Sequence, residues 1–155
     1  MKDINSWLDE YGVSHKNPIN KAIHWICVPI IYFSVIGLLA EIPVPSYFAS
    51  ESIYCNFATL GLVISAIYYF MLSKRLSIGM IAFLCIIGCV LFYMLERGMP
   101  VWEISLFIFV VAWIAQFVGH NIEGKKPSFF KDLQFLMIGP IWLMSFIYKK
   151  LGINY

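Results

Sequence analysis

This 155-residue chain has three histidines, a residue type that can bind a metal ion. His15 and His24 lie near the beginning of the sequence, whereas His120 lies far along the chain. Imidazoles with at most one carboxylate suit zinc, copper or iron, and they do not suit calcium or magnesium. The residue types alone leave iron and zinc open. The elements that carry these side chains decide whether the three can meet.

A predicted helix start separates the first two histidines. Asn17 is a good N-cap, and Pro18 suits the first helical position, where its missing N–H has no partner to lose. In one straight helix, nine residues at about 100° each would place His15 and His24 on opposite faces. The break at Asn17 frees His15 to fold back towards His24. Asn20, one turn before His24, is then expected to orient that ring or to line the site.

The third histidine belongs to a polar stripe at the end of an apolar segment. Gln116 precedes His120 by four positions and Glu123 follows it by three, so one helix face carries them all. Taken singly, each residue has a simpler interpretation, such as an interfacial hydrogen bond or a surface ion pair. Ionisable residues that border a membrane are costly to expose to lipid, so the joint pattern favours a metal or catalytic site. Gly124 is predicted to end this helix.

The composition is that of an integral membrane protein. Hydrophobic residues make up 61% of the chain and charged residues 13%, with a mean hydropathy of +0.79, whereas soluble domains have about 45–50% apolar and about 25% charged residues. No linker or low-complexity tract divides the chain, so residues 1–155 are predicted to form a single membrane-embedded helical domain. The net charge of +2 indicates no nucleic-acid partner. The polar, acidic start argues against a cleavable signal peptide.

Four apolar stretches are long enough to cross a bilayer, which takes about 20 residues. A fifth stretch is shorter and is interrupted by Gly139-Pro140, which predicts a bent or re-entrant segment packed against protein. Cys85 and Cys89, four positions apart, are expected to be small core residues. The predicted fold is an all-α bundle of four transmembrane helices plus a broken, re-entrant fifth segment. The stretches are Ala22–Ala40, Ile53–Leu72, Leu76–Leu95, Val101–Gly119 and the shorter Leu133–Tyr148.

The basic residues predict the orientation of this bundle. With a cytoplasmic N-terminus, ten of the eleven lysines and arginines lie on the cytoplasmic side, and only Arg97 lies outside. The first span begins on the cytoplasmic side and the fourth ends there, so all three histidines are expected at that membrane face. Such a convergence is what a metal site requires. The missing signal peptide and the compact size favour a bacterial inner membrane over the endoplasmic reticulum.

Two motifs resemble the signatures of a known family. The first is Y-x3-H-x4-N-x3-H-x4-P, from Tyr11 to Pro29, and the second is QFVGH-x2-EGKKP, from Gln116 to Pro127. Together they resemble the yeast-type 2-hydroxy fatty acid dioxygenases, over nearly the whole chain. The resemblance implies an Fe(II)-dependent enzyme of fatty acid α-oxidation. Such an enzyme takes a long-chain 2-hydroxy fatty acid and dioxygen and yields a fatty acid one carbon shorter.

By position, the resemblance makes His15, His24 and His120 the iron ligands and the catalytic residues. A 2-hydroxy acid can chelate iron through its carboxylate and hydroxyl oxygens and leave a position for dioxygen. The acyl chain is expected to run among the apolar side chains of the bundle, next to membrane lipid. The expected substrate-binding residues are Lys125, Lys126, Asn20 and Gln116, and Glu123 is expected as a further ligand or as the partner of a ligand.

Three other functions stay open from the residues. A zinc-dependent membrane lipid hydrolase would use Glu123 as the general base for a metal-bound water. A haem protein would use two of the histidines as axial ligands and would handle electrons. A small membrane scaffold would carry out no chemistry. The residue pattern makes no prediction of the oligomeric state.

Overall fold

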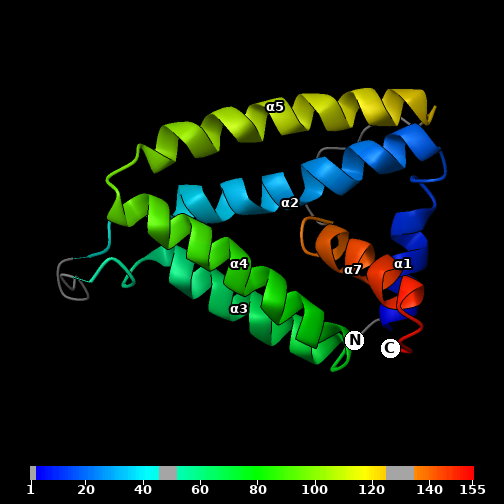
Figure 1. The fold of residues 1–155 in the computed structure, drawn as a ribbon. Coiled ribbons are helices and arrows are strands. Elements are labelled where there is room, and N and C mark those ends of the chain that lie inside the picture. Colours follow the sequence, from blue (N-terminus) through cyan, green and yellow to red (C-terminus); the bar gives the residue numbers. More distant parts are fainter. Residues whose placement is uncertain (1–2, 46–51, 125–134) are drawn as a thin grey trace.

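The computed structural model describes residues 3–45, 52–124 and 135–155, and these residues form six helices (Figure 1). Their helical content confirms the predicted all-α class. The helices are α1 (Ile4–Gly12), α2 (Pro18–Ala40), α3 (Phe57–Leu72), α4 (Leu76–Glu96), α5 (Val101–Ile122) and α7 (Ile138–Lys150).

α2 begins at the predicted helix start. Asn17 has an extended backbone, and its side-chain oxygen accepts hydrogen bonds from the backbone N–H groups of Ile19, at 2.8 Å, and Asn20, at 3.4 Å. Pro18 occupies the first helical position. The helix therefore starts earlier than Ala22, where the predicted span begins, and it includes a polar first turn.

α5 extends past the end of the predicted span. The helix runs to Ile122, so His120 lies in its last turn. Gly124 follows with a φ of +72°, a left-handed conformation that glycine adopts without a steric penalty. The predicted role of Gly124 as the end of this helix is confirmed.

Three helices are long and apolar enough to cross a membrane, namely α2, α4 and α5, with 23, 21 and 22 residues. They indicate a membrane protein. α3 is apolar but has 16 residues, and at 1.5 Å per residue it is about 24 Å long, less than the roughly 30 Å of a bilayer core. This helix is shorter than the predicted span because Asn56 caps it, accepting the backbone N–H of Thr59 at 3.0 Å.

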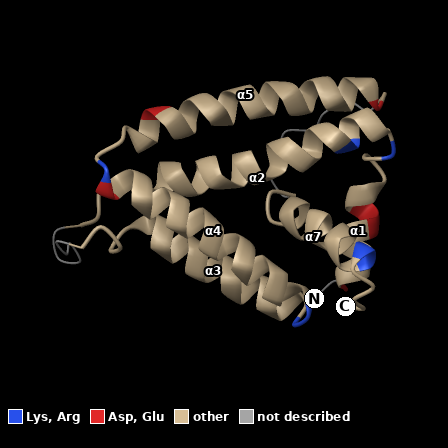
Figure 2. Ribbon diagram, in the orientation of Figure 1, with Lys and Arg blue, Asp and Glu red and all other residues tan. Residues whose placement is uncertain are grey.

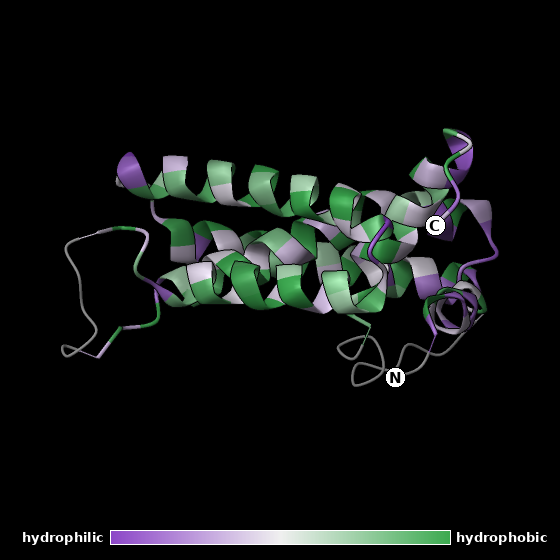
Figure 3. Ribbon diagram, turned by 90° about the horizontal axis from the view of Figure 1, so that it is seen from below, coloured by the Kyte–Doolittle hydropathy of each residue, from purple (hydrophilic) through white to green (hydrophobic). Residues whose placement is uncertain are grey.

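The long helices form two pairs. α2 and α5 lie side by side, and α3 and α4 form a second antiparallel pair that contacts α2 (Figure 1). α1 and α7 lie at the end where α2 begins and α5 ends. Charged residues gather at the ends of the long helices and in the connections (Figure 2), and the stretches between them are mostly hydrophobic (Figure 3).

Small residues allow α2 and α5 to approach closely. A Cβ atom on Gly37 of α2 would clash with the Ser105 side chain of α5, and a Cβ atom on Gly119 of α5 would clash with the Asn20 side chain of α2. Small residues are common where membrane helices associate, because that association depends on close packing. These contacts set the position of α2 against α5 and hence of the histidines that the two helices carry.

The last apolar segment differs from the expectation. The predicted interruption at Gly139-Pro140 lies in the first turn of α7, so the helix Ile138–Lys150 continues past it. A proline in the first turn removes no intrahelical hydrogen bond, which explains why the helix is not broken. Leu133 and the residue after it lie outside the described residues.

The sequence pattern does not predict α1. Asp3 caps this helix by accepting a backbone N–H of its first turn at 3.0 Å. Ile4, Leu8 and Tyr11 form its buried face at helical spacing. Nine residues are too few to form a stable helix alone, so contacts with α7 stabilise α1 in the folded protein.

Candidate metal centre

Three histidines converge where α2 begins and α5 ends. Potential ligand nitrogens of His15, His24 and His120 all lie within 4.8 Å of one another, and all three side chains are buried. The ring centroids are 4.2 Å apart for His15 and His24, 5.4 Å for His15 and His120, and 5.0 Å for His24 and His120. The structure thus brings together the three residues that the topology predicted to meet.

Backbone carbonyl groups orient two of the rings. Nδ1 of His15 lies 2.6 Å from the carbonyl oxygen of Tyr11, and Nδ1 of His24 lies 2.9 Å from that of Asn20. A carbonyl oxygen only accepts, so Nδ1 carries the proton in each neutral ring and Nε2 keeps the lone pair. Nε2 of His15 is buried and has no hydrogen-bond partner among the described residues. Metal-binding histidines are usually held in this way, with the other ring nitrogen donating to a protein acceptor.

His15 is neutral at neutral pH. The pKa of His15 is lowered from 6.5 to about 4, mainly because the charged ring would lose its hydration on burial, and the nearby His120 and Lys21 also act to lower it. The hydrogen bond to Tyr11 and the charge of Glu123 raise the pKa, but they do not outweigh the burial. Neutral imidazole is the form that binds a metal ion.

Aromatic side chains of α1 and α7 enclose the ring of His15. Tyr11 stacks on it with a centroid distance of 4.2 Å and an interplanar angle of 8°, and Trp142 lies 5.2 Å away at an angle of 48°. Tyr11 belongs to the first sequence motif, whereas no motif includes Trp142. Spacing could not identify Trp142, because α7 reaches the site only through tertiary packing.

Glu123 connects the end of α5 to the segment that carries His15. Its carboxylate oxygens accept the backbone N–H groups of Lys16 and Asn17, each at 2.8 Å, and the side-chain amide of Asn20 at 3.1 Å. Burial raises the pKa of Glu123, but these hydrogen bonds together outweigh it and hold the pKa below its ordinary value. The carboxylate is not part of the group of three histidines.

Asn20 is fully buried and joins three parts of the site. Its side-chain nitrogen donates to the carbonyl oxygen of Ser14, at 3.0 Å, as well as to Glu123. Its backbone carbonyl is the group that accepts from His24. The sequence placed Asn20 on the face of His24, and in the structure it touches both the ring and the loop before α2.

Of the other predicted substrate-binding residues, the structure describes Gln116 alone. Gln116 is buried one turn before His120, and it lines a small cavity of about 20 Å³. Lys125 and Lys126 lie outside the described residues.

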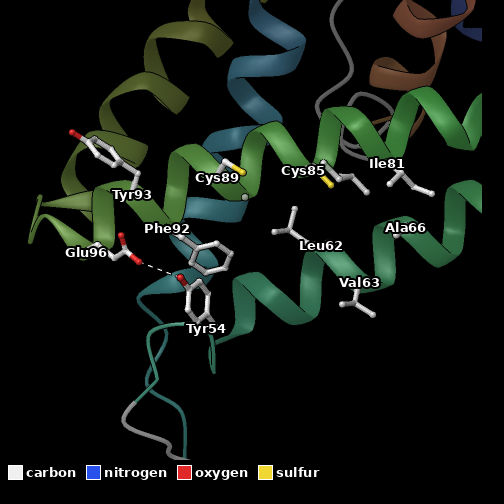
Figure 4. A pocket seen from close by; sticks show the side chains of 12 residues that line it. Tyr54, Leu62, Val63, Ala66, Ile81, Cys85, Cys89, Phe92, Tyr93 and Glu96 are labelled. Atoms are coloured by element: carbon white, nitrogen blue, oxygen red, sulfur yellow. Dashed lines mark hydrogen bonds between the residues drawn. The ribbon is translucent and has the colours of Figure 1, made fainter.

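Of two pockets, one is lined by His15 and the other lies away from all three histidines. One of about 480 Å³ lies between α1, α2 and α7, with His15 in its wall. A larger one of about 560 Å³ lies between α3 and α4 and extends to Tyr54 and Glu96, which share a hydrogen bond of 3.1 Å (Figure 4). The larger pocket is mostly apolar and contains none of the three histidines. The smaller pocket is therefore the one that belongs to the candidate centre.

The larger pocket also corrects the expectation for two cysteines. Cys85 and Cys89 line it, and both side chains are exposed. They are not core residues, because the described helices leave this face of α4 open (Figure 4).

Comparison with known proteins bears on the family that the two motifs suggest. The sequence model of the family described as 2-hydroxy-palmitic acid dioxygenase Mpo1-like matches residues 1–151. This chain belongs to the Mpo1-like family. A relative from Saccharomyces cerevisiae, named 2-hydroxy-palmitic acid dioxygenase MPO1, is 30% identical over 154 residues, which cover 98% of this chain and 83% of the relative. No solved structure matches the chain.

The Mpo1-like match includes every part of the candidate centre. It covers the segment of His15 and His24, the segment of His120, and Trp142 of α7. The family predicted from the two motifs is confirmed.

Proposed function

We propose that this chain is an Fe(II)-dependent dioxygenase of fatty acid α-oxidation, which converts long-chain 2-hydroxy fatty acids into fatty acids one carbon shorter. The observation that carries the proposal is the group of three buried histidines, with ligand nitrogens within 4.8 Å of one another. Membership of the Mpo1-like family supports the substrate class, because the yeast relative is named for 2-hydroxy-palmitic acid.

The donor set fits a metal ion such as Fe(II). In His15 and His24 the Nδ1–H groups donate to backbone carbonyls, which leaves the Nε2 lone pairs for a ligand role. The buried Nε2 of His15 has no hydrogen-bond partner among the described residues, and a metal ion would satisfy it. His15, His24 and His120 are the proposed ligands. Bound Fe(II) would supply the redox chemistry through which dioxygen reacts with the substrate.

The proposed reaction balances without an external reductant. RCH(OH)COOH and O2 give RCOOH, CO2 and H2O. The bond between C1 and C2 breaks, C2 becomes the new carboxyl carbon, C1 leaves as carbon dioxide, and the electrons lost by these two carbons reduce dioxygen. The chain holds the substrate's carboxylate and hydroxyl beside the histidines. Tyr11 and Trp142 cover His15 and exclude bulk water from it.

The polar residues around the histidines are proposed to have separate roles. Asn20 and Glu123 position the ligands, because their hydrogen bonds connect the loop of His15 to α2 and α5. Gln116 is proposed to contact the substrate near His120. Lys125 and Lys126 are also proposed to bind substrate, on the resemblance of their motif alone.

The contacts of the centre favour this proposal over a zinc hydrolase and over a haem protein. A zinc hydrolase needs a free general base, but the Glu123 carboxylate already accepts three hydrogen bonds. A haem protein needs space for a porphyrin between two axial histidines. Here the ring centroids are 4.2–5.4 Å apart and the rings meet edge to face, which leaves no such space.

We also propose that the whole chain acts as a single domain with the histidine end at the cytoplasmic face. Lys16 and Lys21 lie at the start of α2, and Lys149 and Lys150 end α7. Arg97 follows α4 at the opposite end. This distribution supports a cytoplasmic N-terminus, and a bacterial inner membrane is the favoured location.

Oxygen uptake by the purified protein tests the proposed function. Fe(II)-loaded protein in lipid nanodiscs is expected to consume dioxygen when 2-hydroxypalmitate is added and to form one pentadecanoate per dioxygen. Palmitate, which lacks the hydroxyl, and zinc-loaded protein are the controls and should give no uptake. A folded, iron-loaded protein without uptake or product would defeat the proposal. A Soret band would favour the haem alternative instead.

A further inference from the structure

The pocket beside the candidate centre carries two ammonium groups that face one aromatic ring. Nζ of Lys21, on α2, lies 5.2 Å from the centroid of the Phe146 ring, and Nζ of Lys149, on α7, lies 6.0 Å from it. Both lysines, Phe146 and His15 line the same pocket of about 480 Å³. Two helices thus direct positive charge to one place in the pocket that His15 also lines.

Neither ammonium group has an anionic partner in the part of the chain that the structure describes. Asp9 lines the same pocket, yet no Asp or Glu oxygen of the described residues lies within 4.0 Å of Nζ of Lys21 or Lys149. Two like charges that approach one ring repel each other, and the ring offsets this only in part. An anion bound between them would remove the repulsion and would be attracted by both.

We infer that Lys21 and Lys149 bind the carboxylate of the 2-hydroxy fatty acid, and this inference rests on the proposed function. The substrate's hydroxyl and one carboxylate oxygen face the histidines, and the second carboxylate oxygen accepts hydrogen bonds from the two ammonium groups. The rings of Trp142 and Phe146 form the apolar wall for the first carbons of the acyl chain. The pocket therefore selects 2-hydroxy acids over 1,2-diols of the same chain length.

These two lysines act at positions that the sequence motifs leave unspecified. Lys21 lies inside the first motif at a variable position, and Lys149 lies beyond the second motif. Only the packing of α7 against α2 brings them together. They are distinct from Lys125 and Lys126, so the two lysine pairs can be tested independently.

Ligand binding by the metal-free full chain tests the inference separately from turnover. 2-Hydroxypalmitate and 1,2-hexadecanediol differ only at the head carbon, which is an anionic carboxylate in the acid and a neutral CH2OH group in the diol. Tryptophan fluorescence follows binding because Trp142 lines the pocket. At neutral pH the wild type should bind the acid about tenfold more tightly than the diol, as expected for hydrogen bonds to charged groups. The double variant Lys21→Met, Lys149→Met should lose this preference and bind the diol as before.

Matched variants distinguish the pocket from general surface charge. Lys150 is the exposed neighbour of Lys149 and does not line the pocket, so Lys150→Met should keep the wild-type preference. Lys21→Arg with Lys149→Arg keeps the charges and should keep it as well. An unchanged preference in the double methionine variant, or an equal loss in Lys150→Met, would overturn the inference. So would phosphatidic acid vesicles that compete as well as the free acid, since the pocket would then bind a phosphate headgroup.

Turnover of the wild type in the same preparation separates the two proposals. Oxygen uptake together with acid binding that does not depend on the lysines overturns the inference and leaves the proposed function standing. Acid binding that depends on Lys21 and Lys149 in a protein without oxygen uptake supports the binding site and defeats the proposed function.

Discussion

His15 and His24 have the same hydrogen-bonding pattern although they lie in different elements. His15 is in the loop before α2 and His24 is within α2, yet Nδ1 of each ring meets the backbone carbonyl four residues earlier. Each short segment thereby orients its own ring and leaves Nε2 for a ligand role. Two of the three proposed ligands are therefore oriented by local structure, before any metal ion binds.

The lowered pKa of His15 predicts that metal-free protein loses stability as the pH falls from 6.5 to about 4. The unfolded chain takes up a proton at His15 near pH 6.5, whereas the folded protein takes it up only near pH 4. Between these values, protonation favours unfolding. The contribution of His15 to this loss is complete below pH 4, where it is on the order of 3 kcal/mol, and it is absent above pH 6.5. Melting temperatures measured over this pH range test the effect.

A matched variant isolates the contribution of His15 to this pH dependence. His15→Gln removes the titrating ring and keeps a side chain that can donate a hydrogen bond. Its melting temperature should fall less steeply with decreasing pH than that of the wild type. Identical slopes would contradict the prediction.

Replacing Glu123 with Gln is expected to weaken metal binding while the protein stays folded. The carboxylate accepts the backbone N–H groups of Lys16 and Asn17, and a glutamine offers one acceptor oxygen and an N–H that faces a donor. Metal affinity should fall about 10- to 100-fold, the usual effect of losing a group that positions a ligand, as measured by Co(II) titration. Glu103→Gln, in the first turn of α5, is the control. Wild-type affinity in Glu123→Gln would refute the positioning role.

At the scale of elements, the contact between α2 and α5 sets the geometry of the centre. Gly119 lies against Asn20, so Gly119→Ala should force the helices apart, lower the melting temperature and weaken metal binding. Gly88→Ala on α4 is the matched control, since its Cβ would meet Leu62 at an ordinary distance of 3.4 Å. This control should be neutral or more stable by about 0.5–1 kcal/mol, because alanine favours a helix. Metal binding and stability unchanged in Gly119→Ala would contradict the account.

The ends of the helices could be predicted from sequence, because local chemistry determines them. Asn17 and Pro18 start α2, and Gly124 ends α5, through groups within one turn of the helix end. The length of α3 and the helix α1 could not be predicted in this way. α1 depends on its contacts with α7, and the cap at Asn56 shortens an apolar stretch that hydropathy alone extends.

The residues of the site also divide into those that the sequence can predict and those that depend on tertiary packing. The three histidines could be predicted to meet, because the order of the spans brings their segments to one end. Trp142, Lys21 and Lys149 could not be assigned to the site, because α7 brings its side chains to α2 through tertiary packing. Because a break is expected at Gly139-Pro140, the sequence does not predict α7 as one continuous helix.

At the scale of the whole molecule, the distribution of basic residues between the two ends of the bundle predicts one orientation in the membrane. In a chain whose four cysteines are replaced by alanine, Arg97→Cys should react with a membrane-impermeant maleimide in intact bacterial cells. Lys150→Cys, at the histidine end, should react only after the membrane is permeabilised. The reverse labelling pattern would contradict a cytoplasmic N-terminus.

The central claim is that His15, His24 and His120 together bind one metal ion. X-ray absorption at the iron edge of Fe(II)-loaded protein tests it most directly, because it counts imidazole ligands. We predict one iron per chain with three imidazole nitrogens in the wild type, and loss of this site in His120→Ala. Iron that binds without imidazole ligands, or an unchanged iron site in His120→Ala, would contradict the account.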